Sequence, residues 1–183
     1  MKTLEDFVRV YDNALSPMQC EIILTRFKNS SQWNPAGQGS NSTDPNLRNC
    51  DTVDISDHKA NGGAHLDLDQ ILFNGVGRTV QRYIKEFPQV MIKHDTGYEL
   101  LRYGTGTECR EHVDSYPDRP RTLSCSINLN NDYEGGEFTF FDGALRYRVP
   151  AGSAIVFPSN FQYPHAVAPI TQGTRYSVIT WLV

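Results

Sequence analysis

The spacing of hydrophobic and polar residues changes near the middle of this chain. In the first half, residues 16–28 and 66–87 repeat apolar side chains every three or four positions, the spacing of a helix that buries one face. Ser16 can cap the first helix and Gln19 can complete a capping box, while Pro88 ends the second helix. The sequence therefore predicts two helices before residue 96.

From Tyr98 onward the pattern is that of short strands, separated by turn sequences such as Glu134-Gly135-Gly136. The predicted strands cover residues 98–103, 121–129, 137–141, 145–149, 153–157 and 175–182, after two earlier ones at 7–11 and 49–55. Many short strands at this spacing predict a mainly β (α+β) fold of the sandwich or jelly-roll type. The two N-terminal helices are expected to pack on one outer face of the sheet.

Composition and charge narrow the class of protein. With 183 residues, of which 39% are hydrophobic and 21% charged, the chain fits one globular domain, residues 1–183. A net charge of −4 and a pI of about 5.7 argue against a nucleic-acid partner. The sequence has no apolar run of about 18 residues, which argues against a membrane span, and early acidic residues argue against a secretory signal.

The cysteines bear on the redox environment. They are scattered, with no CxxC pair, and stand at Cys20, Cys50, Cys109 and Cys125. Such spacing is typical of reduced thiols and not of a disulfide framework. We therefore expect a cytoplasmic protein.

The strongest candidate for chemistry is His112-Val113-Asp114, together with His165. Residues two apart on an extended strand point to the same face, so His112 and Asp114 can bind one ion. His165 lies in a later β segment and can supply a third ligand. Two histidines and one carboxylate are the facial triad of non-haem Fe(II) oxygenases, which leaves the opposite face of the metal open.

Other interpretations of these histidines remain open. An isolated H-x-D sequence also occurs by chance, and two histidines with an acid also suit a zinc hydrolase. The zinc interpretation leaves Arg175 unexplained. The remaining histidines, expected to be surface or satisfied core groups, are His58, His65 and His94.

Arg175 begins the last predicted strand, ten residues after His165. On that strand it shares a face with Ser177, Ile179 and Trp181, and a buried guanidinium there would need an anion. Arginine forks two hydrogen bonds onto a carboxylate. Arg175 is therefore either an ordinary surface residue of the strand or a ligand for a carboxylate-bearing co-substrate such as 2-oxoglutarate.

The stretch from Tyr103 to Trp181 resembles the prolyl-hydroxylase branch of the 2-oxoglutarate/Fe(II) oxygenases. The matching motifs, in order, are Tyr103-Gly104, His112-Val113-Asp114, Leu129-Asn130, Gly135-Gly136-Glu137-Phe138, residues 150–157, Pro164-His165 and Arg175-Tyr176. The resemblance implies a double-stranded β-helix, with a helical support over about 1–95 and a catalytic jelly-roll core over about 97–183.

The resemblance also implies roles for the site residues. The implied metal ligands and catalytic residues are His112, Asp114 and His165. The co-substrate 2-oxoglutarate would chelate Fe(II) and pair its 5-carboxylate with Arg175, and Tyr103 would line its pocket. Asn128 stands where the hypoxia-factor prolyl hydroxylases use a tyrosine, which leaves its contact with the co-substrate open. With O2, and ascorbate as a candidate reductant, the reaction would release succinate and carbon dioxide and hydroxylate a C–H bond.

The substrate is the least determined part. The branch favours prolyl 4-hydroxylation of a protein or peptide, and residues 30–46 and 115–120 could be a lid over that substrate or plain connectors. A small molecule or free amino acid is an alternative substrate. A nucleic-acid demethylase is disfavoured by the charge and by Trp181, where such relatives tend to carry a second arginine. A non-catalytic jelly-roll binding module is disfavoured by the complete ligand set.

Overall fold

Both predicted helices form within one residue of their predicted ends. The computed structural model describes residues 2–36 and 48–183. Helix α1 (Pro17–Phe27) follows a complete capping box between Ser16 and Gln19, and α2 (Leu66–Glu86) ends shortly before Pro88. Within the described ranges, neither helix is long and apolar enough to cross a membrane.

The strands follow the predicted pattern, with ends displaced by a few residues. A 3-10 turn, η1 (Leu4–Phe7), precedes the first strand. The described strands are β1 (Arg9–Tyr11), β2 (Asn34–Pro35), β3 (Asp51–Asp54), β4 (Glu99–Tyr103), β5 (Cys109–His112), β6 (Leu123–Asn128), β7 (Tyr133–Gly135), β8 (Phe138–Phe140), β9 (Leu145–Tyr147), β10 (Ala154–Pro158), β11 (His165–Val167), β12 (Ile170–Gly173) and β13 (Arg175–Leu182). The sequence analysis did not delimit β2, β5, β7, β11 and β12, which have two to four residues each.

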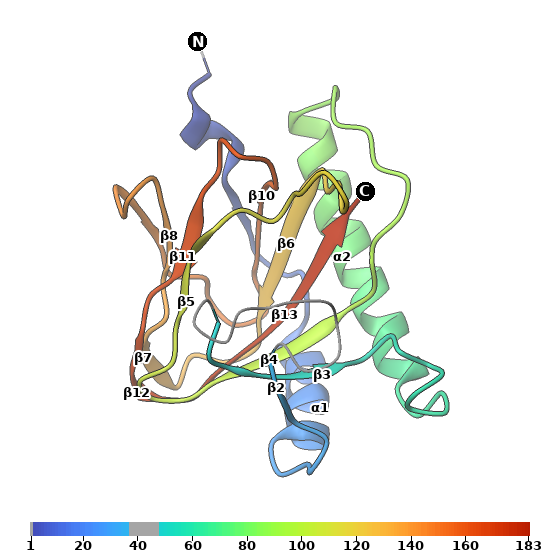
Figure 1. Ribbon diagram of the computed structural model, residues 1–183. Coiled ribbons are helices and arrows are strands. Elements are labelled where there is room, and N and C mark those ends of the chain that lie inside the picture. The colour runs from blue at the N-terminus through green and yellow to red at the C-terminus, as the bar shows by residue number, and fades with distance from the viewer. Residues whose placement is uncertain (1, 37–47) are drawn as a thin grey trace.

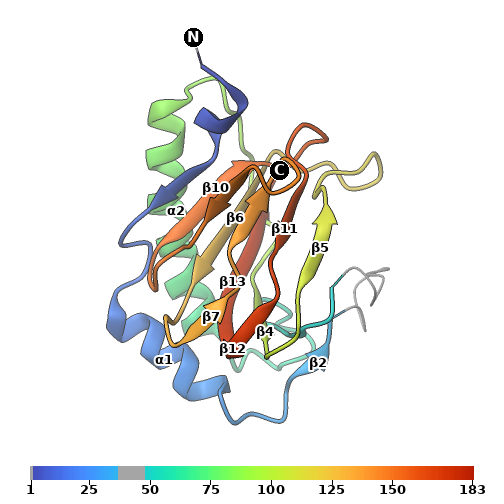
Figure 2. The same cartoon turned by 90° about the vertical axis from the view of Figure 1, so that its left-hand side faces the viewer.

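Two antiparallel sheets face one another, with both helices on the far side of the larger one (Figures 1 and 2). The larger sheet has the order β1-β10-β6-β13-β4-β3-β2, the smaller one the order β5-β11-β8-β9, and β12 pairs with β7. This arrangement confirms the predicted mainly β jelly roll with its helices on one sheet. The N-terminal half also supplies strands to the larger sheet: β1 at one edge and β3 with β2 at the other.

The larger sheet separates an apolar layer from a mixed interior. In β6, Cys125 and Ile127 point toward the helices and belong to the core that contains Leu72 and Tyr83 of α2. Ser126, the residue between them, lies on the opposite face, toward the smaller sheet. The space between the two sheets is therefore the place where polar side chains can meet.

Two glycines in α2 differ in how closely they are packed, although both would weaken an isolated helix. A Cβ added at Gly75 would lie 2.7 Å from Ala14 O and 2.9 Å from Leu15 Cδ2, whereas one added at Gly77 would meet nothing within 4 Å. We expect Gly77→Ala to raise the free energy of unfolding by about 0.5–1 kcal/mol, the ordinary gain in helix propensity. Gly75→Ala is expected to lower it by about 1–3 kcal/mol through overpacking.

Urea denaturation of the two variants measures this difference, because each serves as the control for the other. A Gly75→Ala protein as stable as the parent would contradict the close approach of α2 to Ala14.

Candidate metal and co-substrate site

The three predicted metal ligands converge between the two sheets. His112 ends β5, Asp114 follows two residues later, and His165 begins β11, which pairs with β5 so that the two histidines lie opposite each other. One ligand atom from each residue lies within 4.8 Å of the others. The Nε2 atoms of His112 and His165 lie 3.3 Å and 3.4 Å from the Oδ1 and Oδ2 atoms of Asp114, respectively.

Each imidazole is oriented by its other nitrogen. His112 Nδ1 donates to Arg110 O at 2.9 Å, and His165 Nδ1 donates to Tyr163 O at 3.1 Å. A carbonyl only accepts, so Nδ1 of each ring donates a proton to it and Nε2 is the nitrogen left to bind a metal. In both rings Nε2 faces Asp114, the orientation that metal-binding histidines require.

Burial and neighbouring charges shift the pKa of Asp114 in opposite directions. The carboxylate is only 4% exposed, and burial opposes its ionisation, but the charge of His165 and hydrogen bonds from both histidines hold its pKa well below its usual range. Burial lowers the pKa of His112, yet its bonds to Asp114 and Cys109 outweigh this and raise the pKa to about 10. The site therefore keeps an anionic carboxylate beside two imidazoles, a donor set that suits Fe(II).

Arg175 is buried in the same space. Its side chain is 1% exposed, Nη1 donates to Ser177 Oγ at 3.0 Å, and Nε has no hydrogen-bond partner among the described residues. The guanidinium carbon lies 5.5 Å and 5.4 Å from the ring centres of Tyr103 and Phe138. A buried cation with an unpaired donor, held between two aromatic rings, is suited to an anionic ligand.

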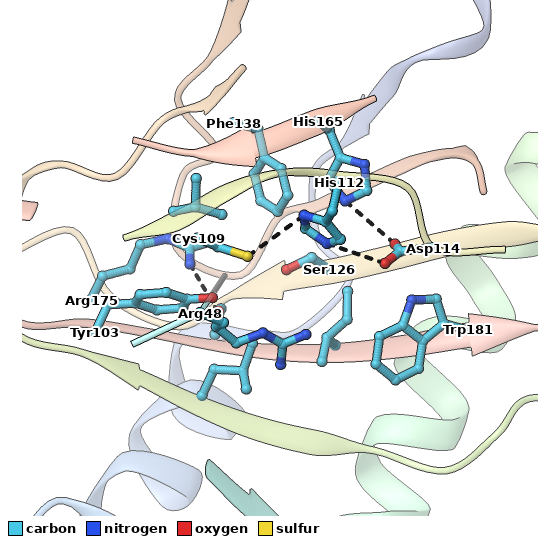
Figure 3. Close-up of a pocket in the computed structure, with 14 residues that line it drawn as sticks. Arg48, Tyr103, Cys109, His112, Asp114, Ser126, Phe138, His165, Arg175 and Trp181 are labelled. Carbon is cyan, nitrogen blue, oxygen red and sulfur yellow. Dashed lines mark hydrogen bonds and ion pairs between the residues drawn. The ribbon is translucent and has the colours of Figure 1, made fainter. Parts of the chain in front are cut away.

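One pocket joins the triad to Arg175. Arg175 and Tyr103 lie at one end of it and Trp181 at the other, with the three ligands beside the stretch between them (Figure 3). The pocket is lined by Arg48, Leu101, Tyr103, Cys109, His112, Asp114, Ser126, Phe138, His165, Val167, Arg175, Ser177, Ile179 and Trp181. A carboxylate-bearing co-substrate can therefore reach from the guanidinium to a metal held by the triad.

Asn128 is not among the residues that line this pocket. It lies at the end of β6, and its amide nitrogen donates to Asn130 O and Val149 O at 2.6 Å and 2.9 Å. Its Oδ1 is buried without a hydrogen-bond partner among the described residues. A contact between Asn128 and the co-substrate remains a prediction.

Sequence reasoning missed three polar groups around the site. Arg48 reaches the pocket from outside any strand, joined to β5 only by a single bridge to Cys109, so no pattern could have placed it there. Ser159 follows β10 and carries a backbone oxygen that accepts hydrogen bonds from Asp114 N and Ser115 N. Arg121 donates from Nη1 to Asp114 O at 3.1 Å and stacks on Trp181, with its guanidinium carbon 3.5 Å from the ring centre.

The structure describes one of the two candidate lid segments completely and the other only in part. Residues 115–120 form a tight turn in which Tyr116 and Arg119 exchange backbone hydrogen bonds, directly after Asp114. Of the predicted loop 30–46, residues 37–46 lie outside the described residues, and Asn34–Pro35 form β2. A lid function for either segment remains a prediction.

Comparison with known families agrees with the site geometry. Residues 98–183 match the model of the 2OG-Fe(II) oxygenase superfamily, and this segment contains all three metal-ligand candidates and Arg175. Residues 98–183 of this chain are thus similar to the 2OG-Fe(II) oxygenase superfamily. Fe(II) and 2-oxoglutarate are therefore the groups that the triad and the buried guanidinium accommodate.

Among similar proteins, a PKHD-type hydroxylase of Synechococcus sp. strain CC9902 is 41% identical over 127 residues, which cover 64% of this chain and 56% of that protein. The chain spans between 38% and 56% of the length of the PKHD-type hydroxylases that it matches.

Two solved structures share the jelly-roll fold. A prolyl hydroxylase of Trichoplax adhaerens, in complex with a hypoxia inducible factor peptide fragment, has a TM-score of 0.78 at 16% identity and covers 96% of this chain and 83% of its own. A viral collagen prolyl hydroxylase of Paramecium Bursaria Chlorella virus-1, in a 2OG complex, has a TM-score of 0.69 at 15% identity and covers 96% and 95%. At these identities the likeness shows the fold alone.

Proposed function

We propose that this protein is an Fe(II)- and 2-oxoglutarate-dependent hydroxylase that acts on proline in a peptide or protein. The observation that carries the proposal is the convergence of His112, Asp114 and His165 in the same pocket as the buried Arg175, whose Nε has no hydrogen-bond partner among the described residues. A metal site alone would suit several activities. The guanidinium beside it selects chemistry that needs a carboxylate co-substrate.

Each part of the pocket has a task in this reaction. Iron with bound 2-oxoglutarate supplies the activation of O2, and the reaction converts 2-oxoglutarate, O2 and a C–H bond into succinate, carbon dioxide and an alcohol. His112, Asp114 and His165 hold the ion, and Arg175 pairs with the 5-carboxylate and so sets the orientation of the co-substrate. Leu101, Phe138 and Ile179 exclude water from the pocket and thereby strengthen these charge interactions.

Proline in a peptide is the substrate that the relatives support. The curated relatives are named PKHD-type hydroxylases, and one structural neighbour is a prolyl hydroxylase that holds a peptide fragment. Trp181 gives the end of the pocket away from Arg175 an apolar wall, and Ile179 adds apolar surface to the same pocket, which suits a proline ring. The turn at residues 115–120 lies next to Asp114, where it could cover a bound peptide.

Two further expectations belong to the proposal. Cys20, Cys50, Cys109 and Cys125 are free and buried, which supports a reducing, cytoplasmic environment. The larger sheet contains strands from both halves of the chain, which supports treating residues 1–183 as one oxygenase domain.

The test combines two measurements on the same reaction. The protein is incubated with Fe(II), 2-oxoglutarate and ascorbate, with and without proline-containing peptides, while succinate is quantified and the peptides are weighed by mass spectrometry. We expect peptide-dependent succinate release, matched by the gain of one oxygen atom on proline. Parallel reactions contain free amino acids and methylated oligonucleotides.

The outcomes separate the candidate functions. Turnover with free amino acids alone would reject a peptide substrate and retain the hydroxylase. Demethylation of the oligonucleotide would identify the repair-type alternative. Absence of succinate under every condition, from protein that binds Fe(II) and 2-oxoglutarate, would leave a non-catalytic binding module.

A further inference from the structure

Behind the candidate metal site lies a chain of buried hydroxyl groups that ends on Asp114. Ser124 Oγ lies 2.6 Å from Asp114 Oδ2, and Ser159 Oγ lies 2.8 Å from Ser124 Oγ. Both serines are fully buried, Ser124 in the middle of the larger sheet and Ser159 in the loop that leads from β10 to His165. The chain thus links the carboxylate to the segment that carries the second histidine.

Counting protons fixes the direction of this chain. The ionised carboxylate of Asp114 can only accept, so the single hydroxyl proton of Ser124 points to Oδ2. Ser124 must then accept from Ser159, which donates its own proton. Each bond polarises the next, so the bond from Ser124 to the carboxylate is stronger than an isolated pair would make.

The backbone of Asp114 is held as firmly as its side chain. Its N–H donates to Ser159 O at 3.2 Å, and its carbonyl accepts from Arg121 Nη1 at 3.1 Å. Ser159 therefore contacts Asp114 twice, directly through its backbone and through Ser124 with its hydroxyl. Of the two carboxylate oxygens, Oδ1 accepts no hydroxyl bond among the described residues and faces His112 Nε2.

We infer that Ser124, supported by Ser159, is a positioning residue that occupies Oδ2 and presents Oδ1 of Asp114 to the metal as a single-oxygen ligand. This inference rests on the proposed function, since it requires that the triad binds Fe(II). The hydroxyl chain opposes rotation of the carboxylate and thereby maintains the position of its ligand oxygen before the metal arrives. It also couples that position to the loop before His165.

The test measures metal affinity and coordination separately from turnover. Co(II) serves as the probe, because its visible absorption reports both binding and ligand geometry. We expect Ser124→Ala to weaken Co(II) binding about 10- to 100-fold, the usual effect of removing a partner of a metal ligand, and to change the absorption at saturating metal. Ser159→Ala should weaken binding less, and the double variant should resemble Ser124→Ala, because Ser159 acts through Ser124.

Thr180→Val is the matched control. Thr180 is buried on the neighbouring strand β13, on the face away from the pocket, and its hydroxyl has no partner among the described residues. This variant loses a buried hydroxyl without touching Asp114, so its Co(II) affinity and spectrum should match the parent protein. Circular dichroism verifies folding, and Ser159→Ala, which lies in a loop, carries the test if Ser124→Ala does not fold.

Failure of the inference and failure of the proposed function give different results. Unchanged Co(II) affinity and spectrum in the serine variants, while His112→Ala abolishes binding, would overturn the positioning role and leave the metal site intact. A parent protein whose Co(II) binding does not depend on His112 would overturn both.

Discussion

His112→Ala and Asp114→Ala are each expected to weaken Fe(II) binding by more than about 100-fold and to reduce the decarboxylation of 2-oxoglutarate to background. Each change removes one of the three candidate metal ligands found among the described residues, which is more severe than the 10- to 100-fold cost of losing a partner of a ligand. Asp114→Ala also leaves the buried His165 and the partly buried His112 without their anion. Metal titration and succinate release measure the two effects on the same samples.

The control for these variants is His94→Ala. His94 is exposed and lies outside the pocket, so its loss removes an imidazole without removing a ligand candidate. It should retain the metal affinity and the decarboxylation rate of the parent. Equal decarboxylation in His112→Ala and His94→Ala would refute the assignment of the triad.

Arg175→Ala should weaken 2-oxoglutarate binding by about 2–4 kcal/mol, or roughly 30- to 1000-fold, because hydrogen bonds to charged groups contribute more than neutral ones. Arg175→Lys keeps the charge but cannot fork onto a carboxylate, so an intermediate loss is expected. Calorimetric titration of the metal-loaded protein with 2-oxoglutarate gives these affinities directly. The affinity for the metal itself should change little.

Arg102→Ala provides the matched control for Arg175. Arg102 lies on the neighbouring strand β4, pairs with Asp51, and stacks over Trp33 on the helix side of the sheet, away from the pocket. Its loss should leave 2-oxoglutarate affinity unchanged. The same affinity in all three arginine variants would mean that the co-substrate does not bind at Arg175.

The parts that the sequence predicted are those where a local pattern determines the geometry. His112 and Asp114 are two residues apart, so one short extended segment brings them to the same side. The alternation along β13 likewise places Arg175 and Trp181 on the pocket face, as the structure confirms. The two helices were predictable because their apolar residues keep one spacing over three to six turns.

The parts that escaped prediction depend on contacts between distant segments. The serine at position 124 could be assigned to the polar face of its strand, yet its partner Ser159 lies thirty-five residues further along the chain. Arg48 approaches the pocket through a single bridge from irregular chain, which has no periodic signal. Strands of two to four residues, such as β5 and β11, owe their existence to pairing with neighbours and not to their own composition.

The second half of this chain carries the candidate metal ligands, whereas the first half protects the larger sheet from aggregation. A fragment that starts at Tyr98 would keep His112, Asp114, His165 and Arg175, but β10 would lose β1 and β4 would lose β3. Its sheet would have two bare edges and an apolar face stripped of both helices, features that lead to aggregation. A shortened form of this protein therefore needs to retain the N-terminal segments, although they supply none of the three candidate metal ligands.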